Sequence, residues 1–170
     1  MQRISTATNP TRLPDGFVRL AASMPLHNDA ERVASLLDSG ALWADRLVAP
    51  AAPTGLRRYA LDLRLRVGRD GPGLPTFSKA AYVDLGTTRR TAAGWEGEIG
   101  WQASTAAPLF PVFSGWLIIS DESLRIDGVY APPGGVVGRA ADRMLLHVAA
   151  NGTARWLLGE IDRAALGAAA

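Results

Sequence analysis

Alternation between apolar and polar residues dominates the middle of the chain. From residue 58 to residue 67 every second residue is a tyrosine, leucine or valine, and the residues between them are mostly charged. Because successive side chains of a strand point to opposite faces of a sheet, this pattern predicts a half-buried strand. Further strands are predicted at residues 77–85 and 95–102, and the short turns between them indicate an antiparallel meander.

Three more segments complete the predicted sheet. In residues 110–120 the odd and the even positions are both largely apolar, so neither face of a strand would be polar. This predicts a strand that is covered on both faces or lies at an interface. A tight turn at residues 121–123 leads into a strand at residues 124–130, and a short first strand is predicted at residues 17–22. The sheet therefore has about six or seven strands.

Two short helices are predicted between the first and second strands. Asn28 is the expected N-cap of the first, and Gly40 is the glycine expected just beyond its end. The second covers residues 42–47 and stops before Pro50.

A long helix is predicted after the proline and glycine breaker at residues 132–135, beginning near Val136. At about 100° per residue its apolar stripe runs through Val148, Gly152 and Trp156, with Gly159 also near the stripe centre. Glycines at that place allow a close backbone approach or leave a void. Arg155 borders the stripe, where it either covers apolar surface with its stem or offers its guanidinium to a carboxylate.

This order of elements resembles the helix-grip fold of the START-like (SRPBCC) superfamily, which includes bacterial polyketide cyclase-like proteins. The likeness in letters is best at residues 126–135 and continues through residues 153–158. The resemblance implies an α+β fold in which a curved antiparallel sheet wraps around a long C-terminal helix, with a deep apolar cavity between them. We expect residues 1–13 to form a flexible tail and residues 14–170 a single domain.

Composition excludes several function classes. The chain has 18 basic and 16 acidic residues, and the arginines are spread along it, so nucleic-acid binding is not predicted. There is no cysteine and no run of apolar residues long enough for a membrane span. The start of the chain lacks the apolar core of a secretory signal, so we expect a cytoplasmic protein without metal or cofactor.

Candidate chemical groups are few. His27 and His147 are expected at the solvent edge, and Glu96 and Glu98 are expected to face water beside strand arginines. Lys79 has the alternation of inward residues, for which a bulge or a late strand start is the simpler interpretation.

The hypothesis favoured by this scarcity is non-catalytic binding, transport or sensing of a small apolar or amphipathic molecule in the cavity. The alternatives are a cyclase or dehydratase-like enzyme that uses the same cavity, and a protein-interaction or dimerisation module, for which a homodimer is one expected partner. Each candidate lining residue also has the simpler interpretation of plain core. The expected lining comprises Tyr59, Leu61, Leu63, Leu65, Trp95, Ile99, Trp101, Trp116, Ile118, Met144, Val148, Gly152 and Arg155, with no catalytic residue assigned.

Overall fold

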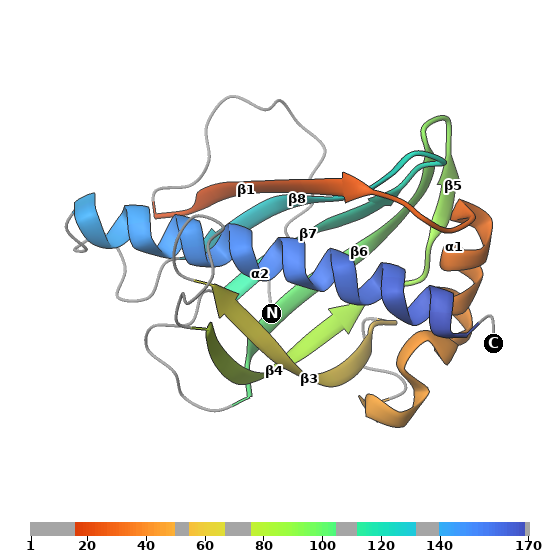
Figure 1. Cartoon of the computed structure of the whole chain (residues 1–170), viewed down its shortest axis with the longest axis horizontal. Coiled ribbons are helices and arrows are strands. Elements are labelled where there is room, and N and C mark those ends of the chain that lie inside the picture. The colour runs from red at the N-terminus through yellow and green to blue at the C-terminus, as the bar shows by residue number, and fades with distance from the viewer. Residues whose placement is uncertain (1–15, 50–54, 67–75, 105–111, 132–139, 169–170) are drawn as a thin grey trace.

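One antiparallel sheet and one long helix carry the fold (Figure 1). The computed structural model describes residues 16–49, 55–66, 76–104, 112–131 and 140–168. Within these ranges, residues 49, 64–66, 76–78, 140–146 and 149 are described by their backbone alone. The predicted tail at residues 1–13 and the predicted helix start near Val136 lie outside the described residues.

Eight strands are present in the described part of the chain, and the sheet order is β1-β8-β7-β6-β4-β3-β2, with β5 paired to β6. Every pairing is antiparallel, as the alternation and the short turns predict. The elements are β1 (Val18–Pro25), α1 (Ala30–Ser39), the 3-10 helix η1 (Ala41–Arg46), β2 (Leu47–Ala49), β3 (Arg57–Arg66), β4 (Thr76–Leu85), β5 (Arg89–Thr91), β6 (Gly94–Ala103), β7 (Val112–Ile119), β8 (Ser123–Ala131) and α2 (Ala140–Gly167).

Helix α2 lies across one face of the sheet, with β1 along one side of it and β3 and β4 along the other (Figure 1). Helix α1 lies at the end of the sheet where α2 ends. This arrangement confirms the predicted helix-grip architecture. The face that α2 covers is called the inner face below, and the opposite face the outer face.

The two short helices after β1 confirm the prediction, with one correction at the start of α1. Asp29 and not Asn28 is the N-cap, because its carboxylate accepts the backbone N–H of Arg32. Gly40 ends α1 with φ 75°, in the left-handed region that glycine adopts without strain.

The stripe predicted for α2 is wrong in the described part of the helix. The side that packs on the sheet and α1 carries alanine, leucine and isoleucine, together with Thr153, whereas Gly152 is only half-buried. Apolar residues occur on almost every side of α2, so periodicity does not single out one face. The fully buried apolar positions are Ala150, Ala154, Leu157, Leu158, Ile161 and Ala165.

The buried carboxylate of Asp162 attaches the C-terminal part of α2 to the β1–α1 loop. Asp162 is 4% exposed, and its carboxylate accepts the backbone N–H of His27 at 3.1 Å and the side-chain amide of Asn28 at 2.9 Å. The His27 ring Nδ1 lies 2.7 Å from the other carboxylate oxygen. Burial alone raises the pKa of Asp162, but these contacts outweigh it and hold the pKa below its usual value. This contact, which the sequence did not predict, holds the β1–α1 loop on α2.

No helix of the described residues is long and apolar enough to cross a membrane.

Candidate ligand-binding site

A row of large side chains crosses the inner face of the sheet. Strand register places one inward residue from each of six strands side by side, and these residues are all partly or fully buried. The short β2 continues the row with Leu47. The row reads Val18, Tyr130, Phe113, Trp101, Val83 and Tyr59.

The centre of the row is an aromatic stack. The rings of Trp101 and Phe113 lie 4.0 Å apart between centroids and are almost parallel, at 16°. The Phe113 ring covers Gly115 and Gly128, because a Cβ atom at either glycine would come within 2.7 Å of Phe113 Cζ. The paired glycines therefore let the ring lie flat on the sheet, which makes a rigid apolar platform facing α2.

Two tyrosines stand at the ends of this platform. Tyr59 packs edge-on against Trp43 of η1 at 5.6 Å, and burial raises the pKa of its hydroxyl while Arg57 offsets part of that rise. Tyr130 lies with its ring centroid 6.4 Å from that of His147, and burial raises the pKa of Tyr130 as well. Both hydroxyls are therefore protonated at neutral pH.

Small residues follow the platform toward one end of the sheet. Ala103 and Ala81 are inward-facing and next to each other, one step beyond Trp101 and Val83. Lys79 is the next inward position on β4 and is half-buried opposite Leu63. The β3–β4 register runs without a shift through Lys79, so the predicted bulge or late strand start is wrong. The inward side chains beyond the platform are therefore smaller than those on it.

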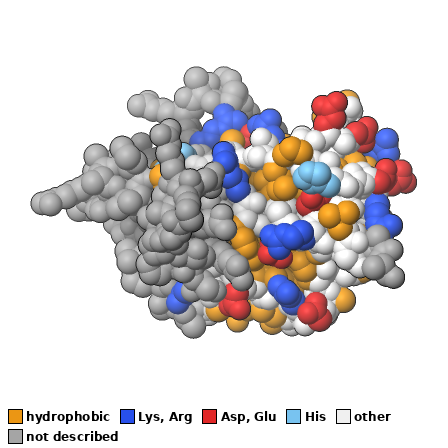
Figure 2. All heavy atoms as spheres, viewed as in Figure 1, with side chains coloured by type: hydrophobic (Ala, Val, Ile, Leu, Met, Phe, Trp, Pro, Cys, Tyr) orange, Lys and Arg blue, Asp and Glu red, His pale blue; other side chains and the backbone are white. Residues whose placement is uncertain are grey.

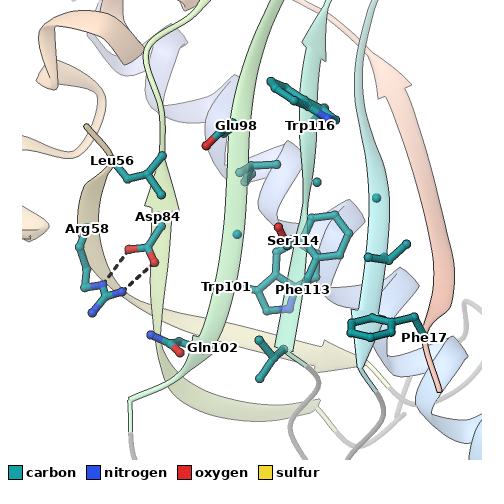
Figure 3. A pocket seen from close by; sticks show the side chains of 16 residues that line it. Phe17, Leu56, Arg58, Asp84, Glu98, Trp101, Gln102, Phe113, Ser114 and Trp116 are labelled. Atoms are coloured by element: carbon teal, nitrogen blue, oxygen red, sulfur yellow. Dashed lines mark hydrogen bonds and ion pairs between the residues drawn. The ribbon is translucent and has the colours of Figure 1, made fainter. Parts of the chain in front are cut away.

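One polar atom of the platform has no partner. Trp101 is 1% exposed, and its indole Nε1 is buried without an acceptor. Figure 3, which looks through the sheet from its outer face, shows the nitrogen edge of the Trp101 ring turned toward the end of the sheet where Gln102 lies. This is also the end at which the inner face carries Ala103 and Ala81.

The structure places six of the predicted lining residues on the inner face, and two of them lie in the row described above. Their inward orientation follows the alternation that predicted it. Trp95 is the least buried of the six and packs against the edge of the core. The side chains of Leu65 and Met144 lie outside the described part. The six are Tyr59, Leu61, Leu63, Trp95, Ile99 and Trp101.

Two predicted lining residues of β7 are on the wrong face. Trp116 and Ile118 share the alternation of Val112 and Ser114 on the outer face, while Phe113 and its inward neighbours are buried. The prediction failed because β7 is apolar at both alternations. The neighbouring β8 carries a usable signal that was missed, since charged Arg125 and Asp127 there mark the outer alternation that pairs with Trp116 and Ile118.

Three predicted residues of α2 lie away from the sheet. Val148 and Arg155 are exposed and Gly152 is half-buried, because the sheet contacts the opposite side of the helix. At Gly159 a Cβ atom would meet only the Arg163 side chain at 3.5 Å, so this glycine does not allow a close approach to the sheet. Sequence reasoning also left Phe113 and Tyr130 out of the lining.

The outer face carries an open hollow of about 600 Å³ (Figure 3). Its centre is shallow because Gly100 and Ser114 stand side by side there. One wall is the Arg58–Asp84 pair, whose two hydrogen bonds measure 2.7 and 2.8 Å. Trp116 stands on another side, with the Glu98 carboxylate nearby. This hollow is a solvent-open trough on the far side of the sheet from α2.

Charges on the outer face are largely paired. Glu96 and Glu98 both lie on the outer face, as predicted. Arg89 contacts Glu96 at 3.3 Å, and Arg19 and Arg125 both contact Asp127. On the α2 side of the molecule, basic and acidic side chains are interspersed in the described part (Figure 2). No cluster of three or more metal-ligating side chains occurs among the residues the structure describes.

Solved structures with a similar fold include two aromatase/cyclase proteins. The di-domain ARO/CYC protein BexL from the BE-7585A biosynthetic pathway matches with a TM-score of 0.51 and 17% identity over 89% of this chain. The chain spans about half the length of BexL, at 51%. The Zhui aromatase/cyclase from Streptomyces sp. R1128 matches with a TM-score of 0.51 and 14% identity, over 91% of this chain and 96% of its own. No protein-family model and no curated protein sequence matches the chain.

These likenesses, together with the sheet order and α2, show that the chain has a helix-grip fold, shared with these two structures. At such low identity they establish the fold and do not transfer a function.

Proposed function

We propose that this protein binds a small apolar or amphipathic molecule between the inner face of the sheet and α2, without converting it. The observation that carries this proposal is the composition of the inner face. The inward positions of the six strands in the aromatic row include no aspartate, glutamate or histidine among the residues described. Acid–base catalysis most often uses these three residue types, whereas a ligand pocket needs mainly apolar surface.

The ionisable groups on this face are few among the residues described. They are Lys79, Arg57 near α1, and the two tyrosines, whose pKa values burial raises. The aromatic stack of Trp101 and Phe113 offers a flat ligand a surface, and the inward residues Ala81 and Ala103 beside it are small. The competing hypothesis is a cyclase-like enzyme, since BexL is described as a di-domain ARO/CYC protein and Zhui as an aromatase/cyclase.

Two alanine-to-leucine substitutions, one in the proposed site and one outside it, test the proposal. Ala81 is buried on the inner face beside Trp101, and Ala60 is exposed on the outer face of the adjacent strand. We expect the parent protein to bind Nile red with a rise in fluorescence, Ala81→Leu to weaken this binding about tenfold or more, and Ala60→Leu to leave it unchanged. A tenfold loss corresponds to about 1.4 kcal/mol of binding free energy.

The dye experiment refutes the proposal if the parent does not bind, or if the two variants bind alike. Circular dichroism of each variant checks that it is folded. If Ala81→Leu does not fold, nuclear Overhauser contacts in the parent replace it: a bound naphthalene must contact the methyl groups of Leu61 or Val83 and not the methyl of Ala60. Recovery of the probe unchanged by mass spectrometry supports binding over turnover.

A second candidate function is homodimer formation through the outer face. Phe17 is 42% exposed and Val112 51% exposed, and both line the outer hollow, so exposed apolar side chains gather in one region of this face. The same face carries charges of both signs, which permits pairing with a second copy. Sedimentation of the parent as a dimer, and of Val112→Asp as a monomer, supports this candidate. A monomeric parent at micromolar concentration removes it.

A further inference from the structure

The unpaired indole N–H of Trp101 calls for a physical reason. Buried polar groups in native proteins nearly always have a hydrogen-bond partner, because a donor taken out of water without an acceptor is unfavourable. Trp101 Nε1 is the one buried side-chain nitrogen or oxygen that lacks a partner in the part of the chain described. A buried donor without an acceptor is therefore exceptional among the described residues.

Packing alone does not require the nitrogen. The contact that Trp101 makes with Phe113 is a stack of ring faces, 4.0 Å apart, which a hydrocarbon ring can also make. A phenylalanine at the same position would keep a stacked ring without burying a donor. Burying the N–H group makes the free energy of folding less favourable unless an acceptor hydrogen-bonds to it.

Among the residues described, the side chains next to Trp101 on the inner face of the sheet supply no such acceptor. Val83 is the register partner of Trp101 on β4, and the next inward positions are Ala81 and Ala103. All three are apolar, and the two alanines lie toward the end of the sheet to which the nitrogen edge is turned (Figure 3). The ring face and the donor thus belong to one wall of the proposed site.

We propose that Trp101 Nε1–H donates a hydrogen bond to an oxygen atom of the bound molecule, and that the ligand is a flat apolar compound bearing a carbonyl group. This inference rests on the proposed function and specifies its ligand. The Trp101–Phe113 platform contacts the apolar part, and the indole N–H selects the oxygen. A site that contains a buried donor discriminates against analogues that lack the acceptor, because the donor is then left unpaired.

Two isosteric probes test this selection. 2-Acetylnaphthalene and 2-ethylnaphthalene differ by a carbonyl group in place of the methylene group next to the ring. We expect the parent to bind the acetyl compound about five- to tenfold more tightly than the ethyl compound, as measured by displacement of Nile red. Trp101→Phe is expected to bind both compounds equally, with the affinity for the ethyl compound retained.

A matched control lies on the same strand. Trp95→Phe removes an indole N–H from another inward position of β6, where the ring is only partly buried and lies beneath Arg90. This variant is expected to keep the preference for the acetyl compound. A Trp101→Phe variant that keeps the preference, or a Trp95→Phe variant that loses it equally, overturns the assignment.

The outcomes separate the two proposals. If the parent binds neither naphthalene, the proposed function fails and this inference fails with it. If the parent binds both equally, binding stands and only the role of Trp101 is refuted. Should Trp101→Phe not fold, the indole ¹H–¹⁵N spectrum of the parent decides. The Trp101 proton must shift downfield with the acetyl compound and not with the ethyl compound, and equal shifts refute the hydrogen bond.

Discussion

Replacing Gly128 with alanine is expected to destabilise the protein, because the glycine pair under the aromatic platform has no room for a side chain. Gly128 of β8 stands opposite Gly115 of β7. A Cβ atom at Gly128 would lie 2.4 Å from the carbonyl oxygen of Ser114 and 2.6 Å from Cα of Gly115. Both are backbone atoms of the adjacent strand and cannot turn aside as a flexible side chain can.

Two effects of this substitution oppose each other. A strand glycine costs about 0.5–1 kcal/mol relative to alanine, so alanine would stabilise an uncrowded position. Here the strands must separate by at least about 0.6 Å for the oxygen contact to reach 3.0 Å. Overpacking of this kind costs about 1–3 kcal/mol. The Cβ atom also meets Phe113 Cζ at 2.7 Å, and disturbing its stack on Trp101 costs about 0.5–1.5 kcal/mol more.

The net expectation is a loss of about 1–3 kcal/mol in the free energy of unfolding, measured by urea denaturation followed by circular dichroism. For a chain of this size the melting temperature should fall by about 2–4 °C per kcal/mol. Gly159→Ala is the control, since its Cβ atom meets only a flexible arginine, and a helical alanine is favoured over glycine by up to about 1 kcal/mol. A Gly128→Ala midpoint at or above that of the parent refutes the crowding argument. A Gly159→Ala variant that is equally destabilised refutes the packing assigned to α2.

Three further substitutions probe the rest of the framework. Trp101→Ala should cost about 3–5 kcal/mol of stability because the ring is fully buried, and an unchanged denaturation midpoint would show that β6 is inverted. Asp162→Asn should cost about 1.5–3 kcal/mol at neutral pH, since the buried carboxylate accepts several hydrogen bonds. Because the folded-state pKa of Asp162 is lowered, its contribution is present above the unfolded pKa of about 3.9 and is lost as pH falls through the folded value. The stability difference between parent and Asp162→Asn should therefore shrink on acidification below about pH 4, and a pH-independent difference contradicts the assignment. Asp38→Ala should cost about 1–3 kcal/mol in thermal unfolding, because its carboxylate accepts both the N–H and the hydroxyl of Thr88, and no loss would show that this contact does not hold in solution.

Strand alternation by itself determined most of the inner face. On β3 and β6 every second residue is mostly charged or polar and faces water. Tyr59 and Trp101 occupy the other positions, so they could only face inward. Glu98 was placed on the outer face by the same rule. The order of elements and the end of α1 at Gly40 could also be predicted from local sequence, because turns and helix caps depend on a few neighbouring residues.

Only the tertiary structure decided which side of α2 is buried and which face of β7 is the inner one. Both elements are apolar on more than one side, so their sequences suit several packings equally, and contact with the sheet selects one. The pairing of His27 with Asp162 joins residues 135 positions apart, and no local pattern encodes it. Likewise the sequence determined that Trp101 is buried, but whether its indole nitrogen has an acceptor depends on every neighbour that the fold brings to it.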